Sequence, residues 1–279
     1  MRKGLMSISA LALLVITCCS GSGEDPKPDG QKKRITLLTY NIHHGAPADP
    51  AAPAPPSVIN LNNIAAVIKQ SKAEVIALQE VDVNTTRSPN PEDQIDQAKK
   101  LAELLDMEYY FSKSIDYKGG EYGNLILSKY PLSNKRKLDL PAAPAPDGEQ
   151  RSIALATVTL PDGKTFEFGA THFDLAAIRF EQAQFLNQLS KNINKPLFIG
   201  GDYNATPDSE EMIELKKEFS LSCMGPCPFT IPVNKPNKAI DFVAFNALAK
   251  QAFTLVSGVS MTGQYASDHL PVIAIFQYD

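Results

Sequence analysis

Six short polar clusters, each attached to an apolar run, contain the side chains of this chain that could catalyse a hydrolytic reaction. They are Thr39–Gly45, Leu78–Asp82, Thr171–Asp174, Gly200–Asn204, Ile240–Phe242 and Ser267–Pro271. The chain has only four histidines, and all four fall inside these clusters. Histidines on a solvated surface would be scattered, whereas histidines gathered with Asp, Glu and Asn are typical of a metal or acid–base site.

Several of these side chains are suitable ligands for a cation. Glu80 is a hard carboxylate that can hold Mg²⁺, an ion that takes few protein oxygens and keeps several waters. Asn41 is a neutral amide that can position this carboxylate or a ligand oxygen. Asp268 and Asp241 offer further carboxylates, and His269 offers an imidazole with a possible orienting partner.

Other side chains are suited to proton transfer and phosphate binding. Asp202 and Asn204 follow two glycines that permit close approach of the backbone, and they suggest an acid–base group beside an amide that faces a phosphate. A charged phosphoester needs a metal, donors to its nonbridging oxygens and a group that activates water. The clusters supply each of these parts, so the residue types alone already indicate phosphoester chemistry.

Each of these residues also has a simpler interpretation. A single Asp or Glu at a strand end is usually just solvated. His43 faces the same way as Asn41 if the strand alternation continues, which makes it as suitable for a ligand as for a loop residue, whereas His44 is interpreted as a loop or packing residue. The Lys-Arg-Lys run at 135–137 is interpreted as the exposed tip of a hairpin, too short for a nucleic-acid-binding patch.

The elements that must position these clusters alternate along the chain. Apolar runs predict strands at 34–39, 75–78, 109–115, 124–128, 152–160, 165–171, 197–200, 241–245, 253–260 and 272–276. Helical spacing predicts helices at 61–68, 95–105, 176–191 and 209–218. The first strand–helix–strand unit should place Asn41 and Glu80 at the carboxyl ends of parallel neighbours. Hairpins such as the one at 161–164 add antiparallel pairs, so we expect an α/β domain with mixed sheets.

The N-terminus is expected to be separate from this domain. Residues 1–19 are interpreted as a signal peptide and residues 20–32 as a flexible tether, which leaves 33–279 as the folded domain. The apolar run is too short for a bilayer span of ~20 residues, and Cys18 or Cys19 follows it as in the lipobox of bacterial lipoproteins. We therefore expect an exported domain anchored to a bacterial membrane by lipid, with ordinary secretion as the alternative.

Two further cysteines lie inside the expected domain. Cys223 and Cys227 would be the only cysteines beyond the signal region, and outside the cytoplasm a disulfide between them is expected. Two thiols cannot by themselves make a four-ligand structural zinc site. The sequence therefore favours a disulfide over zinc at this place.

The ordered set of clusters resembles the endonuclease/exonuclease/phosphatase superfamily, which includes deoxyribonuclease I, abasic-site exonucleases, neutral sphingomyelinases and inositol polyphosphate 5-phosphatases. The resemblance covers residues 33–279. Its motifs are Tyr40-Asn41, Gln79-Glu80, Gly123-Asn124, Thr171-His172, Gly201-Asp202-Tyr203-Asn204, Ile240-Asp241-Phe242 and Ser267-Asp268-His269. It implies a four-layer α/β/β/α sandwich with two mixed sheets, and phosphoester hydrolysis that depends on Mg²⁺ or Mn²⁺.

The resemblance also implies a role for each candidate residue. The implied metal site is Glu80, helped by Asn41 and Asp268. The implied catalytic residues are His172, Asp202, Asn204, Asp241 and His269. Asp241 would orient His269, and either His269 or Asp202 could be the base that activates water. Asn124, His172 and Asn204 would bind the substrate, His172 standing where other members use Tyr. Arg87 lies outside the matching motifs; it follows the strand that carries Glu80, where it could hold a substrate anion or equally be an exposed loop residue.

The substrate class is constrained by charge. The net charge is −4, and loss of Arg2 and Lys3 with a signal peptide would take it two units further negative. This balance and the absence of tryptophan disfavour nonspecific nucleic-acid binding, which draws its affinity from Lys and Arg. We expect a monomer acting on a lipid headgroup or a sugar phosphate. A nuclease and a noncatalytic lipoprotein that binds a phosphorylated ligand or glycan are the alternatives.

Overall fold

The computed structural model describes residue 1 and residues 32–49, 58–144, 148–175 and 177–279. The chain divides into two units, residues 1–31 and Lys32–Asp279, and the second contains all of the described secondary structure. Apart from residue 1, the expected signal peptide lies outside the described residues, as does all but the last residue of the expected tether. Within the described part, no helix is long and apolar enough to cross a membrane.

Twelve strands of the described chain form two six-stranded sheets. The first sheet has the order β11 (Thr254–Ser260), β12 (Val272–Tyr278), β1 (Lys33–Asn41), β2 (Val75–Val83), β4 (Gly120–Ser128) and β3 (Glu108–Tyr117). The second sheet has the order β5 (Leu132–Asp139), β6 (Ser152–Thr159), β7 (Thr165–His172), β8 (Leu197–Asp202), β10 (Asp241–Asn246) and β9 (Phe219–Leu221). Each sheet has one parallel pair, β1–β2 and β7–β8, among antiparallel ones, so both sheets are mixed, as predicted.

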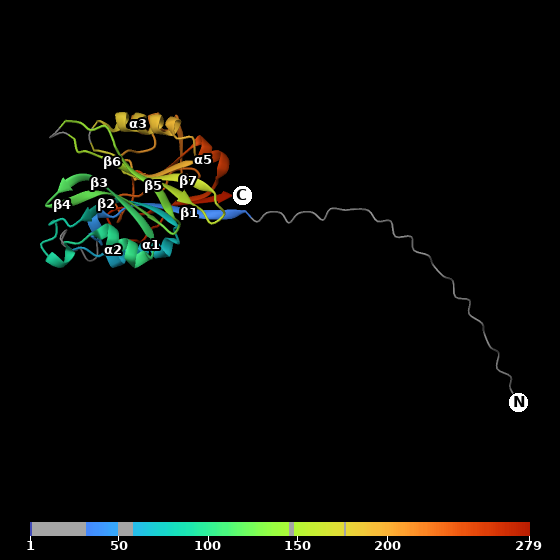
Figure 1. Cartoon of the computed structure of the whole chain (residues 1–279), viewed down its shortest axis with the longest axis horizontal. Helices are drawn as coiled ribbons and strands as arrows, with labels where there is room; N and C mark the ends of the chain where they lie inside the picture. Colours follow the sequence, from blue (N-terminus) through green and yellow to red (C-terminus); the bar gives the residue numbers. More distant parts are fainter. Residues whose placement is uncertain (2–31, 50–57, 145–147, 176) are drawn as a thin grey trace. The chain divides into compact units, whose positions relative to one another are not determined.

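Helices cover the outer faces of the two sheets. They are α1 (Leu61–Ser71) and α2 (Gln97–Leu105) on the first sheet and α3 (Arg179–Asn192) and α4 (Glu210–Leu215) on the second. Helix α5 (Ala247–Ala252) differs, because its Ala249 packs into the apolar cluster between the sheets. There are also two short 3-10 turns, η1 (His43–Gly45) and η2 (Pro91–Asp93). Figure 1 shows α1 and α2 on one side of the paired sheets and α3 on the other. The predicted α/β/β/α sandwich is therefore confirmed.

Three apolar clusters hold these layers together. The central cluster lies between the sheets and includes Phe166 and Phe198 of one sheet and Phe276 of the other. The second packs α1 and α2 against the first sheet, and the third packs α3 and α4 against the second sheet. Central strands are covered on both faces, which explains why they read as continuous apolar runs in the sequence.

Gly200 marks a place where the two sheets come unusually close. A Cβ atom at this position would lie 2.6 Å from the Cβ of Ala77 and 3.1 Å from the Cβ of Thr39, both on the opposite sheet. Real Cβ atoms are not found at the shorter distance, so β8 can approach β1 and β2 only because position 200 has no side chain. This close approach lies two residues before Asp202, at the end of β8 that carries a polar cluster.

Some predicted elements were wrong or were missed. Residues 135–137 are not a hairpin tip but part of β5, which is an edge strand of the second sheet. Their charged side chains suit an edge strand, because charge discourages pairing with another chain. The three-residue strand β9 and the six-residue helix α5 were not predicted. Both are too short for a hydrophobic period to develop.

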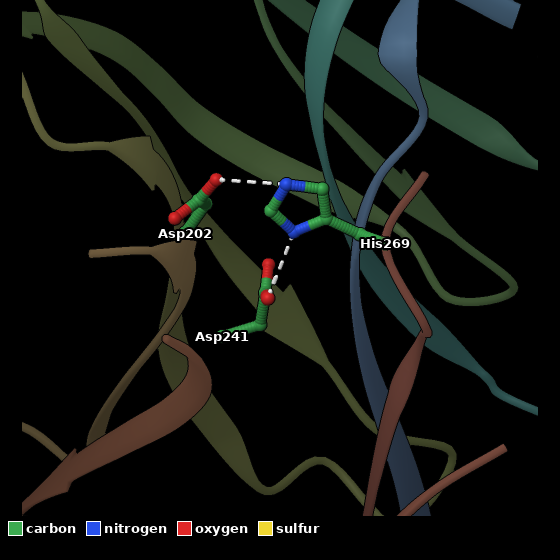
Figure 2. Close-up of side chains that lie close together, drawn as sticks. All are labelled: Asp202, Asp241 and His269. Atoms are coloured by element: carbon green, nitrogen blue, oxygen red, sulfur yellow. Dashed lines mark hydrogen bonds and ion pairs between the residues drawn. The ribbon is translucent and has the colours of Figure 1, made fainter. Parts of the chain in front are cut away.

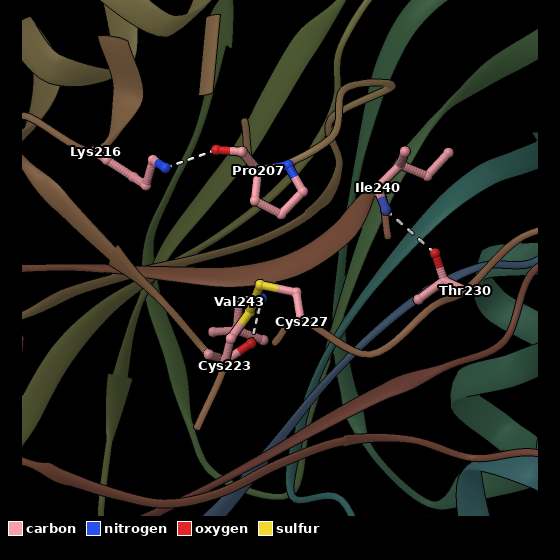
Figure 3. The surroundings of a disulfide bond; sticks show 8 residues. Pro207, Lys216, Cys223, Cys227, Thr230, Ile240 and Val243 are labelled. Atoms are coloured by element: carbon pink, nitrogen blue, oxygen red, sulfur yellow. Dashed lines mark hydrogen bonds between the residues drawn. A yellow bond between two sulfur atoms is a disulfide. The ribbon is translucent and has the colours of Figure 1, made fainter. Parts of the chain in front are cut away.

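The expected disulfide is present. Cys223 and Cys227 are bonded in the loop between β9 and β10, as Figure 3 shows. The loop is also tied to the second sheet, because the backbone N–H of Ser222 donates to the carbonyl of Val243 at 3.0 Å and the Ser222 hydroxyl accepts from the Val243 N–H at 3.1 Å. Both cysteines pack against the third apolar cluster, which lies between the second sheet and helices α3 and α4.

Candidate active site

The polar clusters converge because the strands that carry them end at one edge of the sandwich. In the first sheet, Asn41 at the end of β1 lies beside Gln79 of its parallel neighbour β2. In the second sheet, His172 at the end of β7 lies beside Asp202 at the end of β8. Asp241, the first residue of the antiparallel strand β10, pairs with Asp202. Residues up to 200 positions apart in the sequence are thereby brought to one place.

Asn41 connects the two halves of this cluster. Its buried amide nitrogen donates at 3.0 Å to Oε1 of Glu80 on its own sheet and at 3.0 Å to Oδ2 of Asp202 on the other sheet. Its side-chain oxygen accepts from the backbone N–H of His43 at 3.0 Å. Its backbone carbonyl accepts from the hydroxyl of Ser267 at 2.7 Å. Asn41 therefore acts here as a donor that holds two carboxylates close together.

Glu80 is presented by a bulge and not by a strand end. β2 continues to Val83, but its pairing with β4 is interrupted between Leu78 and Val81, and Glu80 has a positive φ of 60°. A β-bulge re-aims a side chain, and a left-handed backbone at a non-glycine residue is uncommon and concentrates at functional sites. The prediction of parallel β1 and β2 is confirmed, while the exact way in which Glu80 reaches the site was not foreseen.

The surroundings of Glu80 favour its ionised form. Burial alone would raise the pKa of Glu80, but contacts from His44 and Asn41 and the nearby His172 outweigh it and lower that pKa well below its usual range. The Glu80 side chain is nevertheless 22% exposed. A charged carboxylate that solvent can still reach is the arrangement that a hard cation requires.

The two adjacent histidines differ from expectation. They lie in η1 with positive φ values, so the strand alternation that would turn His43 toward the side of Asn41 ends before it. Nδ1 of His43 faces the carbonyl of Ala46 at 3.2 Å, and its side chain is 31% exposed. His44 is buried, and its Nδ1 lies 4.0 Å from Oε2 of Glu80. The residue interpreted only as loop or packing is thus the one beside the candidate metal ligand.

His269 lies between two buried carboxylates, as Figure 2 shows. Its Nδ1 is 3.0 Å from Oδ2 of Asp241, and its Nε2 is 3.7 Å from Oδ2 of Asp202. Burial would lower the pKa of His269, but the negative charges of Asp241 and Asp202 outweigh it and raise the pKa to about 10. The imidazole is therefore held in its protonated, cationic form at neutral pH, oriented by Asp241 as the resemblance implies.

Asp202 lies at the centre of the cluster. Its Oδ1 accepts from the backbone N–H of Asn204 at 2.9 Å, and its Oδ2 faces Asn41, His172 and His269. Burial, followed by the negative charge of Asp241, raises the pKa of Asp202 to about 7. A carboxylate whose pKa lies near neutrality is well matched to accepting a proton from water.

His172 is fixed by an arginine that the sequence analysis missed. Nη1 of Arg151 lies 3.1 Å from Nδ1 of His172, and a guanidinium can only donate. Nδ1 is therefore the acceptor in this contact. Burial and the positive charge of Arg151 lower the pKa of His172 to about 3, although Glu80 opposes this shift. Nε2 faces the cluster, 3.5 Å from Oδ2 of Asp202 and 3.0 Å from Nδ2 of Asn204, which is also a donor. A neutral ring has one acceptor nitrogen, so it cannot accept from Arg151 and Asn204 at the same time.

Three predicted site residues lie at the margin of this cluster. The Asn124 amide donates to the carbonyl of Ser152 at 2.9 Å, and its buried Oδ1 has no hydrogen-bond partner among the described residues. The Asp268 side chain is 40% exposed, and its Oδ1 lies 3.9 Å from Nδ1 of His43. Arg87 does not contact the cluster. It is paired with Asp82 through Nε at 2.8 Å and Nη2 at 3.2 Å.

Two places in the cluster have the composition of a cation site. The oxygens of Asp202 and Asp241 and a ring nitrogen of His269 lie within 4.8 Å of one another. Nδ1 of His269 is paired with Asp241 at 3.0 Å, so Nε2 is the ring nitrogen left to face a cation there. Glu80 is ionised and partly exposed, and its oxygen ligand suits a hard ion. The residues present therefore fit a divalent cation best at Glu80.

This fold and this arrangement of acids, amides and histidines belong to a known class of hydrolases. The family model described as "Endonuclease/Exonuclease/phosphatase family" matches residues 38–269, and the chain belongs to this family. Members of the family hydrolyse phosphoesters and generally use divalent metals.

Individual proteins and solved structures resemble this chain only at low sequence identity. The uncharacterized protein YbhP of Escherichia coli strain K12 is 24% identical over 259 residues, covering 88% of this chain and 96% of its own length. A family protein of Beutenbergia cavernae has a TM-score of 0.67 at 21% identity, covering 88% of this chain and 72% of that one. A mannosyl-6-phosphatase of Bacteroides thetaiotaomicron has a TM-score of 0.65 at 17% identity, covering 87% and 99%. At these identities the likeness to solved structures establishes the fold alone.

Proposed function

We propose that this chain is a magnesium-dependent hydrolase of small phosphoesters, with Mn²⁺ as an alternative ion. The observation that carries this proposal is the position of His269 between Asp241 at 3.0 Å and Asp202 at 3.7 Å, with Asn41 linking Asp202 to Glu80. A cationic imidazole, a carboxylate of raised pKa and an ionised metal ligand are the parts that attack of water on a phosphoester needs. A protein that only bound a phosphorylated ligand would not need a carboxylate of raised pKa.

Glu80 would hold the cation through its carboxylate, while Asn41 keeps that carboxylate in place and Asp268 supplies a further oxygen from the partly exposed side. When bound, the divalent ion would offset the negative charge that builds up on the phosphate oxygens. His44, buried next to Glu80, would restrict the positions open to the carboxylate.

Asp202 and His269 would divide the proton chemistry. Asp202 is the better candidate for the base, because its Oδ2 is turned into the cluster while its Oδ1 is held by the Asn204 N–H. Its raised pKa supports this assignment. His269, already protonated and oriented by Asp241, would stabilise charge on the phosphate.

His172 and Asn204 would bind nonbridging phosphate oxygens. Arg151 fixes the orientation of the His172 ring by donating to Nδ1, so that Nε2 faces the cluster and would carry the proton donated to a phosphate oxygen. The Asn204 amide nitrogen is anchored on the carbonyl of Phe173 at 2.9 Å. Both donors are thus positioned before substrate arrives, as electrostatic stabilisation requires.

A sugar phosphate or a phosphorylated headgroup is the substrate class we favour. The support is the acidic net charge, which disfavours polyanionic nucleic acid, and the mannosyl-6-phosphatase among the structural neighbours. The proposal also includes an exported monomer anchored by lipid on Cys18 or Cys19, with secretion as the alternative. Its support is the N-terminal sequence and the Cys223–Cys227 disulfide, a bond typical of oxidising compartments.

An activity screen tests the proposal directly. The purified domain is assayed on a phosphomonoester, a small phosphodiester, sphingomyelin and DNA, each with Mg²⁺ and with excess chelator. We expect hydrolysis of a small phosphoester that chelator abolishes and Mg²⁺ restores. Faster hydrolysis of DNA would support the nuclease alternative, and hydrolysis unaffected by chelator would contradict metal dependence.

A further inference from the structure

A small pocket adjoins the phosphate-facing side of the cluster. It has a volume of about 130 Å³ and is lined by Arg87, Ile115, Tyr117, Tyr122, Glu149 and Arg151. Arg151 is shared with the candidate active site, because its Nη1 lies 3.1 Å from Nδ1 of His172. Tyr122 on β4 pairs with Asp82 of β2, two residues after Glu80 on the same strand. The pocket is therefore a neighbour of the reacting group and not a remote surface feature.

The positive charges of this pocket are already balanced. Arg87 is held by both oxygens of Asp82, at 2.8 and 3.2 Å. Nη2 of Arg151 lies 3.3 Å from Oε1 of Glu149. Two cations are thus matched by two carboxylates, and Glu149 is itself part of the lining. A second phosphate group would find no unpaired cation here and would face a carboxylate of its own sign.

Hydrogen-bonding capacity, in contrast, is left unused. Arg151 is only 7% exposed, yet its Nε has no hydrogen-bond partner among the described residues. Oε1 of Glu149 is ion-paired with Arg151 at 3.3 Å but makes no hydrogen bond within the described chain, and the Glu149 side chain as a whole is 39% exposed. Buried polar groups without partners are costly, so a donor and an acceptor left open in one pocket point to a ligand that supplies both.

The opposite wall is aromatic and rigid. The Arg87 guanidinium lies 4.5 Å from the ring centre of Tyr117 and 5.6 Å from that of Tyr122, which fixes both rings. The hairpin that carries them is clamped to the loop after β2, because the N–H and hydroxyl of Thr86 both donate to the carbonyl of Lys118 at 2.9 Å. A preformed wall of this kind binds a ligand with little loss of conformational entropy.

We propose that this pocket binds a single hydroxyl-bearing ring of the substrate, such as a hexose or an inositol, while the phosphate of the same molecule lies against His172. The inference rests on the proposed function and adds the identity of the group attached to the phosphate. A hydroxyl both donates and accepts, so it matches the open Nε–H of Arg151 and the open oxygen of Glu149. The apolar face of such a ring can pack on Tyr117.

Size supports the same occupant. The pocket is well below the ~300–1,000 Å³ of sites for drug-sized ligands, so it takes one small ring and not an acyl chain or a stack of nucleotides. A neutral ring also leaves the balanced Arg87–Asp82 and Arg151–Glu149 pairs intact. The substrate this predicts is a monophosphate of a neutral sugar or cyclitol.

Paired kinetics test the pocket. The wild type and Glu149→Gln are assayed with Mg²⁺ on hexose 6-phosphates, inositol phosphate, a hexose bisphosphate and phenyl phosphate, which lacks hydroxyls on its ring. We expect the wild type to prefer a ring monophosphate, and Glu149→Gln to reduce that preference relative to phenyl phosphate about tenfold through KM, the loss expected for one buried hydrogen bond. Tyr117→Ala should act in the same direction. Glu121→Gln is the matched control, because Glu121 lies on the hairpin that carries Tyr117, is exposed to a similar degree (42% against 39% for Glu149) and does not line the pocket.

Other outcomes would overturn the pocket. Equal losses on both kinds of substrate, or a wild type that prefers the bisphosphate or phenyl phosphate, would contradict it while leaving the hydrolase proposal in place. Calorimetric binding of the same hexose phosphates to metal-free protein gives a readout independent of turnover. Binding that Glu149→Gln weakens about tenfold, in a protein that hydrolyses nothing, would uphold the pocket and refute the proposed function. Binding unaffected by Glu149→Gln would refute the pocket.

Discussion

Asn41 and Asp202 form a hydrogen bond between the two sheets of the sandwich. The amide nitrogen of Asn41, at the end of β1, donates at 3.0 Å to Oδ2 of Asp202, at the end of β8. The same nitrogen donates to Glu80, so one buried amide holds the candidate metal ligand and the candidate base at a fixed separation. The relative position of the two sheets therefore determines the distance between Glu80 and Asp202.

Removing this link should cost both stability and activity. Asn41→Ala would leave a buried oxygen of Asp202 and a partly buried oxygen of Glu80 without this donor, and we expect the free energy of unfolding to fall by about 1–3 kcal/mol. Turnover should fall by more than a smaller folded fraction would explain, because Glu80 and Asp202 lose the hydrogen bonds that position them. Urea denaturation and kcat measure the two effects. Asn62→Ala, at an exposed position of α1, should change neither, and wild-type turnover in Asn41→Ala would contradict the role of the link.

Glu80 should determine the metal dependence. Glu80→Gln keeps the size of the side chain and its ability to accept from Asn41 but removes the charge that a divalent cation requires. We expect a loss of at least ~10²-fold in kcat and a higher Mg²⁺ concentration for half-maximal activity. A titration with Mg²⁺ measures both. Glu92→Gln, on the exposed turn η2, is the control, and an unchanged Mg²⁺ dependence in Glu80→Gln would place the metal elsewhere.

Asp241 and His269 should act as one unit. Each alanine substitution should reduce turnover by ~10²–10⁴-fold, the range for a positioned acid–base group. Because Asp241 acts through the ring that it orients at 3.0 Å, the double variant should cost little more than His269→Ala alone. If the fold-loss of the double variant equals the product of the two single fold-losses, the two side chains work independently.

Asp202 should make the metal-free protein less stable as the pH rises. Its pKa in the folded state is raised from 3.8 to about 7, so the folded protein holds this proton more tightly than the unfolded chain does. Stability contributed by the protonated form is therefore lost as the pH rises through that interval. Asp202→Asn should remove this loss and be more stable than the wild type at pH 8, by on the order of 1 kcal/mol or more. Thermal unfolding in chelator between pH 4 and 8 measures it, and parallel curves for the two proteins would contradict it.

The disulfide should affect stability without affecting turnover. It closes a loop of only a few residues, for which the expected stabilisation is about 2 kcal/mol. A Cys223→Ser, Cys227→Ser variant should lose about that much free energy of unfolding and keep its kcat, because neither residue contacts the candidate active site. Mass spectrometry of the mature protein would identify the bond as a mass two hydrogens below that of the dithiol. A readily alkylated pair in the native protein would contradict it.

The fold could be predicted because its strands are covered on both faces. Strand β8 is a continuous apolar run that ends in Asp202, and β10 is one that begins with Asp241, so both the strands and the edge that carries their acids are visible in the sequence. The strand β5 was misread because it lies at an edge, where exposed charges at 135–137 hide the strand pattern. The predicted helix boundaries moved by up to three residues, for example the start of α3 from 176 to Arg179.

The sequence predicted which residues form the site better than it predicted the contacts between them. Asp202, Asp241 and His269 were identified by residue type and chain order, and the structure brings them together. Arg151 was missed because its partner His172 lies 21 positions away and meets it only when β6 and β7 pair. A basic residue directly before a buried strand was the one signal available. The bulge at Glu80 left no signal, since a positive φ at glutamate contradicts its local preference.

Gly200 has a consequence that reaches beyond packing. The two sheets carry different parts of the candidate site, and the missing side chain at position 200 lets them meet closely just beneath it. The distance between the two sheets at Gly200 therefore sets the distance between the site residues of the first sheet and those of the second. Selection for activity can act on a residue that has no functional atom at all, and a search for catalytic positions confined to polar side chains would overlook it.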